Sequence, residues 1–184
     1  MRKIIVALCL AILAAGCATT PNTTPIRSNF ADEDRFVPVN LQLNTDDSVS
    51  SYDSELFSYL YDSLNESRVF ARINTSRQRY QYTINIDYSW NHANTTSAVI
   101  GGAVTIASLG LAPTQYLEDH SMQVEILNGD NVIYNSKYTE RITSSWAFFH
   151  DGIGDRKLGI DKLLKQLFED LRSKKILPLN SESS

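Results

Sequence analysis

The clearest hydrophobic pattern in the chain is a strict alternation over residues 80–90. Apolar and aromatic side chains occupy the even positions, and polar side chains occupy the odd ones: Tyr80, Tyr82, Ile84, Ile86, Tyr88 and Trp90 against Gln81, Thr83, Asn85, Asp87 and Ser89. Successive side chains on a strand point to opposite faces, so this pattern predicts a strand with one buried face. Such strands are typical of antiparallel sheets that are covered on one side.

Further strands are predicted on both sides of this segment. Residues 36–43 alternate in the same way, and a short strand is expected at 68–73. Residues 121–127 and 132–142 are predicted to form a hairpin, because the sequence Asn-Gly-Asp-Asn at 128–131 consists of residues that tight turns favour.

Two segments have the 3.6-residue period of amphipathic helices. The first begins at a Ser50 or Ser51 cap and continues to about Ser67. The second has an apolar stripe at Ile160, Leu163, Leu164, Leu167, Phe168 and Leu171. The element order β-α-β-β-β-β-α predicts a single α+β domain, in which two helices pack on one face of an antiparallel sheet of about four to five strands.

The first seventeen residues have the three parts of a secretory signal. Met1-Arg2-Lys3 is basic, residues 4–15 are apolar, and Gly16-Cys17 follows. The apolar run is shorter than the ~20 residues that a membrane-spanning helix requires. The pattern therefore predicts a signal peptide at residues 1–16.

The sequence Leu13-Ala14-Ala15-Gly16-Cys17 resembles the bacterial lipobox, although the commonest lipobox has leucine where this chain has Ala14. The resemblance covers about the first 20 residues. It implies that the Cys17 thiol receives diacylglycerol, that signal peptidase II cuts before Cys17, and that an acyl chain such as palmitate is added to the new amine. Ala18 in place of aspartate implies transport to the outer membrane, facing the periplasm, with the inner membrane as the alternative. An ordinary secretory signal is the other interpretation.

Removal of the signal peptide changes the charge and the cysteine content. Loss of Arg2 and Lys3 takes the formal charge from −4 to −6, which argues against a nucleic-acid partner. Cys9 leaves with the signal and Cys17 is used for lipid, so no disulfide is expected.

The mature chain is predicted to have three parts. Residues 17–29 are expected to be the lipidated cysteine and a flexible tether, 30–179 the globular domain, and 180–184 a disordered tail. The element order loosely resembles small periplasmic envelope domains such as the amino-terminal domain of TolB. This resemblance implies a similar fold and gives little information about function.

The sequence predicts neither a catalytic site nor a metal or cofactor site. His92, His120 and His150 are expected in loops or at strand ends, and none has the spacing of a zinc motif. Four acids near strand ends are candidates for a hydrolytic carboxylate pair: Asp87, Glu118, Asp119 and Asp151. Because such acids are usually solvated, an enzyme is the less favoured interpretation.

Residues 97–113 form an unusual apolar insert. Sixteen residues from Ser97 to Ala112 contain no charge, and Pro113 follows. An exposed apolar segment of this size promotes association, so the insert is predicted to be core, a docking surface or a membrane contact. Its expected contact residues are Val99, Ile100, Ile106 and Leu109. Trp146, Phe148 and Phe149 form a second apolar cluster that could pack against this insert, although ordinary core is the favoured interpretation.

These features together favour a lipid-anchored, non-enzymatic periplasmic lipoprotein that binds another envelope protein or a second copy of itself. A small hydrolase acting on cell wall or lipid is one alternative. A carrier of a lipidic ligand is the other, which an apolar cavity would favour.

Overall fold

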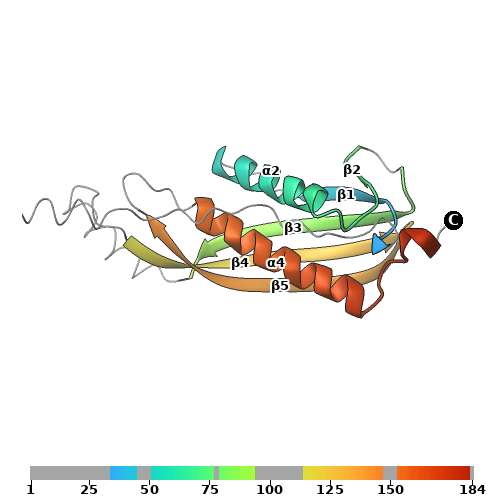
Figure 1. The fold of residues 1–184 in the computed structure, drawn as a ribbon. Coiled ribbons are helices and arrows are strands. Elements are labelled where there is room, and N and C mark those ends of the chain that lie inside the picture. Colours follow the sequence, from blue (N-terminus) through green and yellow to red (C-terminus); the bar gives the residue numbers. More distant parts are fainter. Residues whose placement is uncertain (1–33, 45–50, 77–78, 94–113, 147–152, 183–184) are drawn as a thin grey trace, which may run out of the picture.

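The structure is a computed structural model that describes residues 34–44, 51–76, 79–93, 114–146 and 153–182. In chain order its elements are β1 (Val39–Asn44), α2 (Ser51–Glu66), β2 (Ile73–Asn74), β3 (Tyr82–His92), β4 (Thr114–Asn128), β5 (Asn131–Trp146), α4 (Ile153–Ser173) and the 3₁₀ helix η2 (Asn180–Glu182). Helices α2 and α4 lie on the same face of one five-stranded sheet (Figure 1). The α+β class and the placement of both helices on one face are confirmed.

The sheet is mixed, which corrects the prediction of an antiparallel sheet. Its strand order is β2-β1-β3-β4-β5. The pairs β3–β4 and β4–β5 are antiparallel, whereas β1 is parallel to both of its neighbours, β2 and β3. The physical reason is the connection through α2: a helical crossover returns the chain to the same end of the sheet, so the next strand runs in the same direction.

The hairpin of β4 and β5 is longer than predicted. Its register runs from Thr114↔Trp146 to Asn128↔Asn131, whereas the sequence pattern predicts strands only at 121–127 and 132–142. The extra residues include Glu118 and His120, whose polar side chains interrupt the apolar alternation. At the turn, Gly129 has a φ of 60°, a conformation that glycine adopts without strain.

Two shorter segments also differ from the predictions. The strand expected at 68–73 is reduced to a bridge between Phe36 and Phe70 and the two residues of β2. Residues 180–182, expected in the disordered tail, form η2 instead. The backbone N–H of Asn180 donates a 2.7 Å hydrogen bond to the backbone carbonyl of Arg35. This bond connects η2 to the beginning of the described domain.

The core is one apolar layer between the two helices and the sheet. The stripe predicted on the second helix is confirmed, because every one of its leucines and Ile160 has an exposed fraction of 0 %. The largest fully buried side chains of the layer are Leu56, Leu60, Leu64, Ile84, Ile86, Met122, Ile126, Ile160, Leu163, Leu164, Leu167 and Leu171. Within the described ranges, no helix is both long and apolar enough to cross a bilayer.

Candidate functional site

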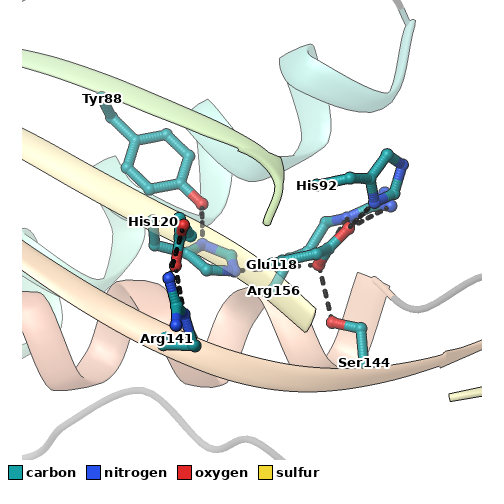
Figure 2. A network of polar contacts seen from close by, with 8 residues as sticks. Tyr88, His92, Glu118, His120, Arg141, Ser144 and Arg156 are labelled. Carbon is teal, nitrogen blue, oxygen red and sulfur yellow. Dashed lines mark hydrogen bonds and ion pairs between the residues drawn. The ribbon is translucent and has the colours of Figure 1, made fainter. Parts of the chain in front are cut away.

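A buried carboxylate, Glu118, lies at the centre of the main polar cluster in the domain. Its exposed fraction is 0 %. Ser144 Oγ on β5 donates a 2.6 Å hydrogen bond to Glu118 Oε2. Arg156, at the start of α4, donates to Glu118 Oε1 from Nη2 at 2.9 Å and from Nε at 3.1 Å (Figure 2). Glu118 therefore links two strands and a helix.

The register of the hairpin explains why these groups meet. Glu118, His120 and Met122 alternate along β4, so their side chains share the face that the helices cover. Glu118 lies opposite Ile142 on β5, and Ser144 is the next residue of β5 on that face. The start of α4 passes over this end of the hairpin, so Arg156 can reach the carboxylate.

The pKa of Glu118 reflects a balance between burial and its donors. Burial raises this pKa, but His120 and the hydrogen bonds from Arg156 and Ser144 outweigh the burial and lower it to about 2. Glu118 is therefore ionised at neutral pH, and the Arg156 guanidinium compensates its charge.

His120 extends the cluster toward β3. The imidazole has an exposed fraction of 0 %, and its Nδ1 forms a 2.8 Å hydrogen bond with the Tyr88 hydroxyl. Its Nε2 lies 3.7 Å from Glu118 Oε2, beyond hydrogen-bond distance, and has no hydrogen-bond partner among the described atoms. Below, the Glu118 network means Tyr88, Glu118, His120, Ser144 and Arg156.

Helix α4 approaches the imidazole closely because residue 159 is a glycine. A Cβ atom at Gly159 would lie 2.7 Å from His120 Nδ1 and 2.9 Å from Cε1. Real Cβ atoms do not come so close to ring atoms, so any larger residue would force the helix or the imidazole to move.

Aromatic side chains border the network at the end of the sheet. The Arg156 guanidinium carbon lies 3.8 Å from the centre of the Trp90 ring, a cation–π arrangement. The His92 ring meets Trp90 and Tyr116 edge to face, at centroid distances of 5.7 and 5.0 Å. Burial, followed by the Glu118 charge, raises the pKa of Tyr116.

The geometry of the Glu118 network is that of a structural link and differs from a hydrolytic triad. In such a triad the histidine lies between the nucleophile and the acid. Here the carboxylate lies between Ser144 and His120, and Tyr88 occupies the other imidazole nitrogen. A carboxyl group with a pKa of about 2 is also a poor general acid at neutral pH.

The structure separates the predicted acidic candidates. Asp119 follows Glu118 on β4 and therefore points to the opposite face, where Arg141 binds it at 2.7 and 3.0 Å. Asp87 is exposed on β3 and lies opposite Gln123 of β4. Gln123 is four residues further along β4 than Asp119. The three acids form no common carboxylate site. Asp151 lies outside the described residues.

Two predictions about the histidines and the strand-end acids are wrong. His120 was expected to be a solvated loop histidine and is buried within β4; Glu118 was expected to be solvated and is buried and paired. In the structure, burial alternates without a break from Tyr116 to Met122, whereas the sequence pattern is interrupted by the two polar side chains. The predicted location of His92 at a strand end is confirmed, since it ends β3.

Several predicted residues lie outside the described part of the chain. These are Cys17, Val99, Ile100, Ile106, Leu109, Phe148, Phe149 and His150. For Trp146, which ends β5, only the backbone belongs to the described part of the chain. Within the described ranges, no group of three or more potential ligands is arranged to hold a metal ion.

Two hollows border the described residues, and one of them includes His120 of the Glu118 network in its lining. One, of about 480 Å³, is on the sheet face away from the helices, which we call the open face. Its lining residues are Asn91, Asp119, His120, Ser121, Lys137, Thr139, Glu140 and Arg141. The other, of about 470 Å³, is bordered by Asp34, Phe36, Arg172, Lys175, Leu177 and Leu179. Both linings contain charged as well as uncharged side chains, whereas a lipid carrier requires a largely apolar cavity.

The sequence matches no protein-family model and no curated protein. Among solved structures, a protein described as a neuraminyllactose-binding hemagglutinin homolog from Helicobacter pylori has a TM-score of 0.49 and 8% identity, covering 83% of this chain and 91% of that one. A minor lipoprotein from Acinetobacter baumannii has a TM-score of 0.40 and 14% identity, covering 77% and 96%. Rare lipoprotein B from Shewanella oneidensis has a TM-score of 0.36 and 8% identity, covering 74% and 96%. At TM-scores below 0.5, these likenesses assign no function.

Proposed function

We propose that the chain is a non-enzymatic lipoprotein, held by lipid on Cys17 at the periplasmic face of the outer membrane, whose domain binds another envelope component. The observation that carries the proposal is the junction Leu13-Ala14-Ala15-Gly16-Cys17 after a basic start and a short apolar run. Each buried CH₂ contributes ~0.8 kcal/mol, so a diacylglyceryl group and an amide-linked acyl chain give stable anchoring.

The distance between the anchor and the fold limits where the domain acts. The described domain begins at Asp34, seventeen residues after Cys17. At ~3.3–3.6 Å per extended residue, the domain remains within about 60 Å of the membrane. A partner at that distance belongs to the outer membrane or to the adjoining periplasm.

The Glu118 network supports a binding role over a catalytic one. Its ionisable groups are buried and contact one another: Glu118 is compensated by Arg156, and the Tyr88 hydroxyl binds His120 Nδ1. Groups arranged in this way stabilise the junction between α4 and the sheet, and they leave the carboxylate no access to a substrate.

The apolar insert is the favoured docking segment. It connects β3, which ends at His92, to its antiparallel neighbour β4, which begins at Thr114. A hairpin connection needs only two to five residues, so the fold itself does not require this length. An uncharged segment is suited to bury Val99, Ile100, Ile106 and Leu109 against a partner.

Crosslinking in living cells tests this role. Val99, Ile100, Ile106 and Leu109 are replaced together by serine in the full-length lipoprotein, and the matched control replaces the polar residues Ser97, Thr105 and Ser108 by alanine. We expect the first variant to fold and lose its crosslinked partner, while the control keeps it. A folded variant that retains the partner contradicts docking through the insert, and a large fall in melting temperature indicates that the insert is core. Release of soluble fragments from purified cell wall would contradict the non-enzymatic role.

A further inference from the structure

The two edges of the sheet differ greatly in length. At one edge, β2 has two residues; at the other, β5 has sixteen, and in the described chain it pairs only with β4. A very short edge strand is one of the ways in which proteins prevent unwanted pairing, whereas a long edge presents a row of unpaired backbone donors and acceptors. The outer edge of β5 is therefore suited to bind another strand.

Exposed apolar side chains lie at both ends of the same hairpin. Of the described residues, the large hydrophobic side chains classed as exposed are Leu117 at 37%, Val132 at 52% and Ile133 at 42%. Val132 and Ile133 lie at the start of β5, where the register with β4 shifts. Leu117 lies at the other end, on β4 opposite Thr143.

We propose that β5 pairs with β5 of a second copy of this chain, antiparallel, with the two-fold axis at Tyr138. In this register Lys137 lies opposite the partner's Thr139, and Asn135 lies opposite the partner's Arg141. Moving the axis to residue 137 places Lys137 opposite itself, and moving it to 139 places Lys137 opposite Arg141. Like charges directly opposite each other destabilise a strand pair, so the register centred on Tyr138 is favoured over these two neighbours.

The same register brings the exposed apolar residues together. Beyond Asn135, the register brings the start of β5, with Ile133 at the irregularity that the β4–β5 pairing skips, toward the partner's Thr143, and the partner's Leu117 lies opposite that Thr143 on β4. Adjacent strands are ~4.8 Å apart, so the two apolar side chains lie on either side of the threonine. The symmetry produces this arrangement twice.

Disulfide trapping in the native membrane tests the pairing, independently of the proposed partner. Cells co-express two differently tagged full-length chains, one with Lys137→Cys and one with Thr139→Cys. Directly opposite residues have Cα atoms ~4.5–5.5 Å apart, within disulfide range. We expect a disulfide between the two tags. The matched control pairs Thr139→Cys with Gln123→Cys, which lies on the same open face one strand further in, and we expect no disulfide there.

A charge exchange provides the second test. Thr139→Lys places an ammonium group opposite Lys137 at both ends of the pair, and we expect co-purification of the two tagged copies to be lost. Adding Lys137→Glu converts each contact to an opposite-charge pair, and we expect co-purification to return. Absence of the disulfide, a disulfide equally strong with Gln123→Cys, trapping of a different protein in its place, or co-purification unaffected by Thr139→Lys would each overturn the proposal.

Discussion

Arg156 at the start of α4 and Glu118 on β4 form a buried ion pair, with 2.9 Å between Nη2 and Oε1. The apolar stripe of α4 begins only at Ile160, so the first turns of this helix lack its apolar contacts with the sheet. The ion pair connects these first turns to β4 instead. The guanidinium lies between this carboxylate and the Trp90 ring, so its position is determined from two sides.

Arg156→Met is expected to destabilise the domain strongly. The substitution preserves much of the side-chain volume but leaves Glu118 buried without its cation, and breaking a buried pair in this way costs ~3–5 kcal/mol. The free energy of unfolding in urea measures the loss. The double variant Glu118→Leu with Arg156→Met is the control, because removing both charges should restore part of the stability. A loss below about 1 kcal/mol in the single variant would contradict the structural role of the pair.

Glu118 also predicts how stability changes with acid. Its pKa is about 2 in the fold and 4.5 in the absence of the fold. The ionised group therefore adds stability above about pH 4.5, and this contribution decreases as the pH falls through 4.5 toward 2. Glu118→Gln should be less stable at neutral pH and should show a flatter acid limb. Urea melts between pH 7 and pH 3 test this prediction, and identical pH slopes for the two proteins would contradict it.

Asp161 predicts a dependence of the opposite sign. Its carboxylate accepts 3.0 Å contacts from the Tyr59 hydroxyl on α2, and burial raises its pKa from 3.8 to about 6. Because the fold favours the protonated form, stability should decrease as the pH rises from about 3.8 to about 6. Asp161→Asn should therefore unfold at higher urea than the parent at pH 7 and at nearly the same urea below pH 4. A loss of stability at pH 7 would show that ionised Asp161 is favourable.

Gly159→Ala should destabilise the domain although alanine favours helices. The gain in helix propensity is ~1 kcal/mol, whereas a Cβ atom 2.7 Å from His120 Nδ1 cannot be accommodated without movement, and overpacking costs ~1–3 kcal/mol. The combination with His120→Ala tests the contact, because removal of the imidazole makes room for the new methyl group. The loss in the double variant should be smaller than the two single losses together, and simple additivity would argue against a direct clash.

The sequence predicts the elements of this fold better than their pairing. The stripe from Ile160 to Leu171 and the alternation at 80–90 are local signals, and both elements are present. The parallel pairing of β1 with β3 depends on the path of the chain through α2 and β2, which lie between them in sequence. It relates residues about 40 positions apart, and no local pattern contains that information. The antiparallel prediction for β1 was wrong for this reason.

The Glu118 network was missed because its members are polar. Glu118 and His120 interrupt the apolar pattern of β4, and polar residues near a predicted strand end are usually solvated. Their burial depends on Arg156 and Ser144, which approach from α4 and β5. Only the register of the hairpin and the path of the helix bring these residues together, so the sequence alone does not reveal the cluster.

Metabolic labelling with a radioactive or clickable fatty acid tests the central claim, lipid anchoring through Cys17, most directly. Full-length wild type and Cys17→Ser are expressed in the same bacterial host, immunoprecipitated and compared on gels. Cys9→Ser, which changes the other cysteine of the chain, is the matched control. We expect label on wild type and Cys9→Ser and none on Cys17→Ser, which should also accumulate as the uncleaved precursor. Label that persists on Cys17→Ser, or a processed wild type without label, would contradict the account.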